Sequence, residues 1–213
     1  VMWGGRQIKD LKAMPHPAEP AGLPRVSVVI PARNEEDGIQ EALMSVLSLE
    51  YPAYEVIVLN DRSEDATGRI LDDLAARHAK QPTLKVIHIE NLPEGWLGKN
   101  HALHTGAMQA SGELLLFTDA DIVFEPTALS RSVAYLQARK LDHLTLQPEL
   151  RMRGIILNAF VSAFTLFFVL FSRPWRVQKR HSGSRSSCRG RICSRHLRDC
   201  SKRRSGSSRY RVR

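Results

Sequence analysis

Charged and amide side chains follow four apolar segments of this sequence, at the point where each segment ends. The four polar stretches are residues 31–35, 60–63, 95–100 and 118–121. One such stretch is an ordinary loop. Four in the same relation to an apolar segment predict a shared site, and this favours a chemical role over four separate solvated loops.

Asp119 and Asp121 are the most informative pair, because residues two apart in an extended chain project to the same side. Two carboxylates with room for water suit Mg²⁺ or Mn²⁺ bridging a diphosphate. Such a metal neutralises charge that grows on a leaving phosphate. The alternative is that Asp-x-Asp only caps the helix expected near Pro126. Directly after a buried apolar segment, the metal interpretation is favoured.

Two further stretches offer groups for a nucleotide. Lys99 follows Gly98 at the expected start of a helix, where backbone N–H groups favour anions and the ammonium adds a mobile charge. The alternative is a turn glycine and a solvated lysine, and the spacing is not that of a P-loop. Asp61 can accept a hydrogen bond from a base imide or a ribose hydroxyl. Alternatively it caps the following helix, with help from Ser63.

Hydrophobic periodicity predicts an α/β domain from residue 25 onward. Strands are expected at 26–30, 54–59, 84–89, 113–117 and 144–147, and helices at 35–49, 65–79, 99–110 and 126–139. Strand–helix alternation with short connections implies right-handed crossovers and a mainly parallel twisted sheet with helices on both faces. Such sheets bind ligands beyond the carboxyl ends of their strands, where the four polar stretches lie.

The net charge of +9 is concentrated at one end of the chain. Residues 173–213 hold 15 of the 31 Lys and Arg residues and a single acid, which leaves 16 basic and 21 acidic residues in 1–172. The front of the chain is therefore mildly acidic and gives no sign of a nucleic-acid partner. The three cysteines lie in the same tail without zinc-ligand spacing. This composition predicts disorder. The tail is either a basic arm for nucleic acid or anionic lipid or, as we favour, the product of a frame error or truncation.

Two other segments flank the expected domain. Residues 1–24 are proline-rich and aperiodic and read as a leader or linker. Residues 155–171 carry no charge, and 17 residues is near the lower limit, roughly 17–25, for crossing a bilayer. Polar residues on one stripe, Asn158, Ser162 and Thr165, make an interfacial helix an alternative to a full span, and a buried core helix is a third. For 151–172 we favour a membrane or interfacial helix.

Residues 28–35, 58–67, 98–106 and 117–121, in this order and spacing, resemble the motifs of family 2 glycosyltransferases across about 25–150. The Trp-x-Gly-Lys stretch at 96–99 is most similar to the membrane-bound branch near hopanoid-associated and ceramide-type glucosyltransferases. The resemblance implies a GT-A fold, a nucleotide-diphospho-sugar donor such as a UDP-sugar, and transfer to a lipid or glycan hydroxyl, with inversion. It also implies association with a membrane, with the catalytic domain on the cytoplasmic side.

The resemblance also implies roles for individual residues. Pro31, Arg33 and Glu35 would cradle the nucleotide, and Asp61 would hold the base. Lys99 would lie near the diphosphate, Asp119 would contact the nucleotide as well as the metal, and Asp121 would bind the same Mn²⁺ or Mg²⁺.

Two elements of the family pattern have no counterpart here. The acceptor-side base and the Gln-x-x-Arg-Trp motif cannot be placed, so no catalytic residue is assigned. We therefore expect the domain at 25–150 to be incomplete and its transferase turnover weak or absent.

Two other functional classes compete with a glycosyltransferase. A nucleotidyltransferase would use a related sheet, but that class usually opens with a glycine-rich loop after the first strand, where this chain has Pro-Ala-Arg-Asn-Glu. A non-enzymatic protein would bind nucleic acid or lipid through the basic tail, and its binding would not depend on Asp119 or Asp121.

Overall fold

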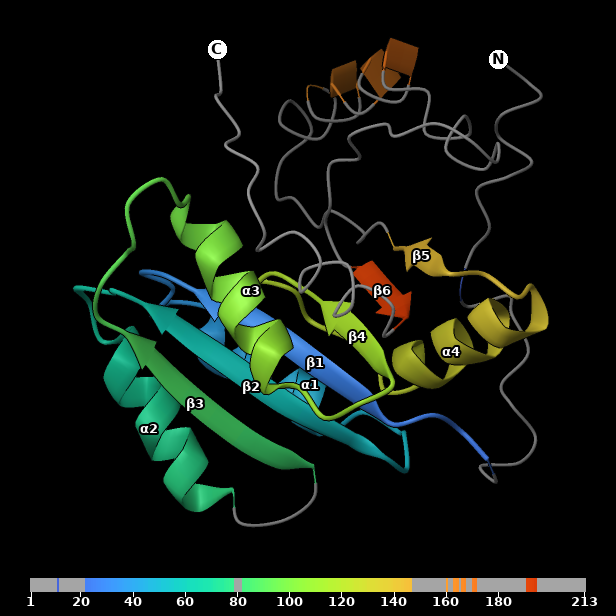
Figure 1. The fold of residues 1–213 in the computed structure, drawn as a ribbon, viewed down its shortest axis with the longest axis horizontal. Coiled ribbons are helices and arrows are strands. Elements are labelled where there is room, and N and C mark those ends of the chain that lie inside the picture. Colours follow the sequence, from blue (N-terminus) through green and yellow to red (C-terminus); the bar gives the residue numbers. More distant parts are fainter. Residues whose placement is uncertain are drawn as a thin grey trace.

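The computed structural model describes residues 22–78, 82–146 and 191–194, together with position 11 and positions 160, 163–164, 166–167 and 170–171. Six strands form one sheet in the order β3-β2-β1-β4-β6-β5 (Figure 1). The strands are β1 (Val26–Ala32), β2 (Tyr54–Asp61), β3 (Thr83–Ile89), β4 (Leu114–Phe117), β5 (His143–Thr145) and β6 (Arg191–Ser194). The helices are α1 (Ile39–Leu47), α2 (Thr67–Arg77), α3 (Gly98–Gln109) and α4 (Ala128–Ala138).

The sheet is mainly parallel, as the sequence predicts. Strand β1 pairs in parallel with β2 and β4, and β2 pairs in parallel with β3. Strand β6 is antiparallel to both of its neighbours, β4 and β5. The four residues of β6 fall inside the segment for which composition predicts disorder, so that expectation does not hold for them. The rest of 173–213 lies outside the described residues, as do most of the leader and most of 151–172.

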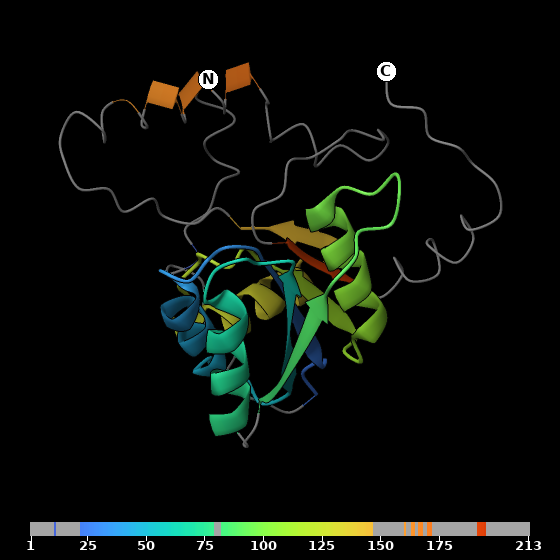
Figure 2. The same cartoon turned by 90° about the vertical axis from the view of Figure 1, so that its left-hand side faces the viewer.

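Helices cover both faces of the sheet (Figure 2). Alternate residues of β1 divide between two apolar clusters, since side chains along a strand point to opposite faces. Val28 and Ile30 belong to the larger cluster, with residues of α1, α2 and α4. Val29 belongs to the smaller one, where Ala102 of α3 packs against the sheet. Burial on both faces explains why these strands read as continuous apolar runs.

Strand β1 continues through Pro31 to Ala32, beyond the end at residue 30 that the sequence predicted. The Val29 carbonyl accepts the N–H of Thr118, so the backbone N–H and C=O groups of Val29 point toward β4. The backbone nitrogen of Pro31, two residues further, points to the same side, where the pairing with β4 has already ended at Phe117. No partner strand needs the N–H that proline lacks, and Pro31 stays paired with Leu59 of β2.

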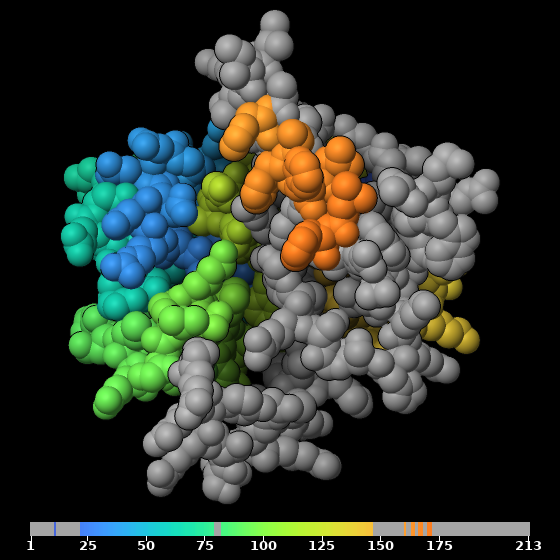
Figure 3. Space-filling view, turned by 90° about the horizontal axis from the view of Figure 1, so that it is seen from above, coloured from blue at the N-terminus to red at the C-terminus, as the bar shows by residue number. Residues whose placement is uncertain are grey.

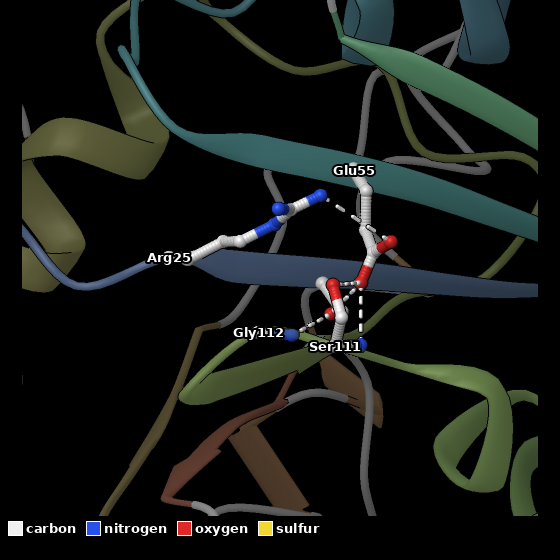
Figure 4. A network of polar contacts seen from close by, with 5 residues as sticks. Arg25, Glu55, Ser111 and Gly112 are labelled. Carbon is white, nitrogen blue, oxygen red and sulfur yellow. Dashed lines mark hydrogen bonds and ion pairs between the residues drawn. The ribbon is translucent and has the colours of Figure 1, made fainter.

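The sheet edge remote from the carboxyl ends is held by the carboxylate of Glu55 on β2 (Figure 4). Its Oε1 atom accepts from the Ser27 hydroxyl at 2.5 Å, the Ser111 N–H at 2.6 Å and the Ser111 hydroxyl at 2.8 Å. Arg25 lies 3.7 Å from Oε2, and the Gly112 N–H donates to the Ser27 hydroxyl. One carboxylate therefore joins β1, β2 and the turn that leads into β4.

This network gives the fold a defined acid sensitivity. Desolvation acts to raise the pKa of Glu55, but the hydrogen bonds from Ser27 and Ser111 and the charge of Arg25 outweigh it and lower the pKa below its usual 4.5. A lowered pKa contributes stability that is present above the unfolded value and is lost as the pH falls through the folded one. We expect Glu55→Gln to flatten part of the fall in unfolding free energy below about pH 4.5, measured by urea denaturation at several pH values.

At neutral pH the same substitution is expected to cost about 1–3 kcal/mol, because it disturbs the acceptor of three hydrogen bonds. The exposed Glu90 provides the control, and Glu90→Gln should leave both quantities unchanged. An unaltered acid limb in the Glu55 variant would contradict the role given to this carboxylate.

Candidate nucleotide and metal site

The carboxyl ends of β1, β2 and β4 meet at one edge of the sheet, beside the start of α3 (Figure 1). The predicted site residues lie at this edge. Burial raises the pKa of Glu35, and the charges of Asp121, Asp119 and Asp65 raise it further, while Lys99 opposes them. Contacts join the polar stretches: Lys99 of α3 lies 2.6 Å from Asp119 after β4, and Gly98 at the start of α3 packs against Asp61 at the end of β2. Pro31 lies within β1, and Arg33 is exposed just beyond it.

Two of the strand ends turn through a left-handed residue. Asn34 after β1 has φ 53° and Arg62 after β2 has φ 55°. This conformation is uncommon for residues other than glycine and is strained for a long side chain such as Arg62. Such strain persists only where the surroundings fix the backbone, so the two loops need an external restraint.

That restraint is a set of hydrogen bonds between the loops, which we call the loop latch. The bonds run from Asn34 N–H to Ser63 Oγ (3.0 Å), Glu35 N–H to Thr67 Oγ1 (2.8 Å), Glu36 N–H to Asp65 Oδ2 (3.2 Å), Glu64 N–H to Asn34 Oδ1 (2.9 Å) and Ala66 N–H to Glu36 Oε2 (2.8 Å). Each loop donates to and accepts from the other. The latch therefore sets the position of Glu35 relative to Asp61.

Asp61 is buried at the end of β2, and its carboxylate is held by the next residue. Arg62 Nε donates to Asp61 Oδ1 at 2.8 Å, and Arg62 Nη2 donates to Oδ2 at 3.3 Å. Asp61 does not cap α2, which corrects that alternative. The N–H of Thr67 bonds to Asp65 instead, and the Ser63 hydroxyl belongs to the latch.

Lys99 reaches across to the end of β4. Its ammonium lies 2.6 Å from Asp119 Oδ1, and the Lys99 side chain is 56% exposed. An exposed pair of this kind contributes about 1 kcal/mol or less, so Lys99 can exchange this partner for another anion at little cost. No side chain caps the N-terminus of α3, which leaves the first backbone N–H groups of that helix without a side-chain acceptor.

The residues present fit a divalent cation bound with a ligand. Asp119 and Asp121 supply hard carboxylate oxygens, and neither caps α4, whose N-cap residue is Thr127 and which has no side-chain cap hydrogen bond. Burial is the main cause that raises the pKa of Glu35, and the charges of Asp121 and Asp119 raise it further; a cation at these aspartates would offset that second contribution. Within the described part of the chain, no group of three His, Cys, Asp or Glu side chains could hold a metal ion. A cation at these two aspartates would take its other ligands from water and a diphosphate.

Comparison with known proteins decides the family. A sequence model described as glycosyl transferase family 2 matches residues 27–190. The chain belongs to glycosyl transferase family 2. A family 2 relative, the poly-β-1,6-N-acetyl-D-glucosamine synthase of Staphylococcus epidermidis, is 35% identical over 134 residues, which are 62% of this chain and 31% of that protein. The chain thus spans about a third of that relative's length.

Solved structures agree with this family 2 assignment. S. aureus TarS 1–349 in complex with UDP is 29% identical, with a TM-score of 0.51 over 62% of this chain and 38% of that one. The mannosyltransferase PcManGT from Pyrobaculum calidifontis, in complex with GDP-Man and Mn²⁺, is 27% identical, with a TM-score of 0.53 over 70% of this chain and 43% of that one. The GT-A fold predicted from the sequence is therefore confirmed.

The sequence did not predict the contribution of Arg62 or of the latch residues Asn34, Ser63 and Asp65. The sequence shows only that both loops are rich in polar residues, with Asn34 in one and Ser63-Glu64-Asp65 in the other. Which of these residues form hydrogen bonds with one another depends on the left-handed conformations of Asn34 and Arg62, and no local sequence pattern predicts those conformations.

Proposed function

We propose that this chain is the donor-binding part of a glycosyltransferase that takes its sugar from a nucleotide-diphospho-sugar, with a UDP-sugar as the first candidate. The acceptor is a hydroxyl of a lipid or glycan, and transfer inverts the anomeric centre. The observation that carries the proposal is the convergence of Glu35, Asp61, Lys99 and the Asp119–Asp121 pair at one sheet edge. Family membership supports it, as do two similar structures, TarS in complex with UDP and PcManGT in complex with GDP-Man and Mn²⁺.

The residues of this chain would divide the donor between them. Asp61 accepts a hydrogen bond from the base, and the loop with Pro31, Arg33 and Glu35 forms the wall beside it. Lys99 and the first N–H groups of α3 face the diphosphate, since helix N-termini favour anions. Asp119 and Asp121 would hold Mn²⁺ or Mg²⁺, which when bound supplies neutralisation of charge on the leaving diphosphate.

A membrane-associated acceptor side is also part of the proposal, with the donor domain on the cytoplasmic side. Described residues of the apolar run are helical and exposed, among them Phe160, Phe164, Phe167 and Phe171 (Figure 3). Exposed aromatic and aliphatic side chains close in sequence suit an interfacial segment. Within the residues that the structure describes, no helix is long and apolar enough to cross a membrane. The finer similarity to hopanoid-associated and ceramide-type enzymes stays a prediction.

Calorimetric titration of the full chain with UDP tests the proposal. We expect binding in the presence of Mn²⁺ that weakens when the metal is chelated, because the diphosphate and the two aspartates share the cation. Titration with GDP in parallel decides between uridine and guanosine donors. Failure to bind either nucleotide, with or without Mn²⁺, would contradict the proposed function.

A further inference from the structure

We infer that Arg62 and Gly98 are positioning residues that hold the Asp61 carboxylate in the orientation in which it reads the imide N–H of the donor's base. This inference rests on the proposed function, because it assumes that Asp61 faces the nucleotide. It goes further in assigning base selectivity to a lock of three residues, Asp61, Arg62 and Gly98, from β2, the loop after β2 and the start of α3.

The first part of the lock is a fork between neighbouring residues. Arg62 contacts both oxygens of Asp61, through Nε at 2.8 Å and Nη2 at 3.3 Å. Two donors in a rigid plane fix the rotation of a carboxylate, which a single point charge cannot do. Arg62 adopts φ 55°, and from this backbone conformation its side chain contacts the carboxylate of the residue before it. The latch bond from Asn34 N–H to the Ser63 hydroxyl holds the residue that follows.

The second part of the lock is the absence of a side chain at position 98. A Cβ atom at Gly98 would lie 2.6 Å from Asp61 Oδ2 and 2.8 Å from Arg62 Nη2. The start of α3 therefore packs directly against the forked pair. Its backbone φ is not left-handed, so close approach rather than conformational freedom is what requires glycine here.

The lock leaves few positions on the Asp61 carboxylate open to a ligand. The Asp61 side chain is 5% exposed, and Arg62 occupies one position on each carboxylate oxygen. An ionised carboxylate only accepts hydrogen bonds, so the remaining positions select a partner that donates. Uracil presents an N–H at its imide, whereas cytosine presents a bare nitrogen acceptor at the same ring position. An Asp61 carboxylate held in place therefore favours UDP over CDP, and one free to rotate discriminates less.

The test is calorimetric titration of the full chain with UDP and CDP in the presence of Mn²⁺. We expect Arg62→Ala and Gly98→Ala each to weaken UDP binding about 10-fold or more, as expected for a misplaced hydrogen bond to a charged group. CDP binding should change little, so the ratio of the two affinities falls. Arg62→Lys should not restore the ratio, because an ammonium cannot form the fork.

Two matched variants separate positioning from general damage. Arg69 is exposed on α2, and a Cβ at Gly38 meets no atom within 4 Å, so Arg69→Ala and Gly38→Ala should keep both affinities. Gly98→Ala changes no charge and decides the question if Arg62→Ala does not fold. An unchanged UDP-to-CDP ratio in folded Gly98→Ala, or an equal loss for both nucleotides, would overturn the inference. Absence of UDP binding by the unaltered chain would count against the proposed function instead.

Discussion

Replacing Asp121 with alanine is expected to remove the Mn²⁺-dependent part of UDP binding, a loss on the order of 100-fold. Substitution of outer-shell residues around metals already costs about 10- to 100-fold in metal affinity, and Asp121 would contact the metal itself. Asp121 is exposed and, within the described part of the chain, forms no hydrogen bond or salt bridge. Replacing Asp121 therefore tests metal binding without breaking a contact that stabilises the fold.

Stability provides a second readout in the same variant. Asp121 adds to the negative charge around Glu35, so its removal relieves repulsion and the free energy of unfolding should stay constant or rise slightly. Asp119 is a less clean choice, because its substitution also breaks the pair with Lys99. Asp73→Ala on α2 is the matched control, since that carboxylate is 61% exposed and pairs only loosely with Arg77. UDP binding by Asp121→Ala that still responds to Mn²⁺ would contradict the metal assignment.

The sheet could be predicted from the sequence because burial on both faces leaves a strong local signal. Val28–Ile30 and Val56–Leu59 are continuous apolar runs, and each is followed along the chain by a helix. The strand ends were less accurate. The sequence treats Pro31 as a stop, whereas the extent of β1 depends on where β4 ends, which is a property of another part of the chain.

The candidate site could be predicted as a set of positions but not as a set of contacts. Parallel strands bring their carboxyl ends together, so the meeting of 31–35, 60–63 and 118–121 follows from topology. Partners do not follow from it. Asp61 has the sequence context of a helix cap, yet it pairs with Arg62, whose backbone is left-handed. Likewise Asp119 pairs with Lys99, twenty residues away along the chain.

The strand β6 shows a different limit. Arg191–Ser194 lies in a segment rich in Arg and Ser, whose composition predicts no element at all. Its place between β4 and β5 is antiparallel to both, and long-range backbone pairing of this kind depends on the strands on either side. Composition indicates how much apolar surface a segment can bury. A strand of four residues that adds to an existing sheet needs to bury little apolar surface of its own.

Gly112→Ala is expected to be the most destabilising single methyl addition at the edge of the sheet that Glu55 holds. A Cβ at this position would lie 2.6 Å from the Ser27 nitrogen and 2.8 Å from the Arg25 carbonyl oxygen, both in backbone that cannot yield as a flexible side chain can. The Arg25 oxygen also accepts the N–H groups of Glu113 and Leu114 where β4 begins. Forcing these strands apart is expected to cost about 3 kcal/mol.

Urea unfolding followed by circular dichroism measures this cost. Gly38→Ala is the control: Gly38 is the N-cap of α1, where alanine is less favourable than glycine, and a cost of about 1 kcal/mol or less is expected. An unfolding midpoint for Gly112→Ala that matches the unaltered chain would show that β1 and β4 can separate without loss. The same variant also tests whether a change where β4 begins alters the site that follows the end of β4. Asp119 follows β4 after one intervening residue, so a displacement of β4 against β1 moves the carboxylates at the opposite edge. Mn²⁺-dependent UDP binding should therefore weaken in the folded fraction of Gly112→Ala, although position 112 contacts neither metal nor nucleotide.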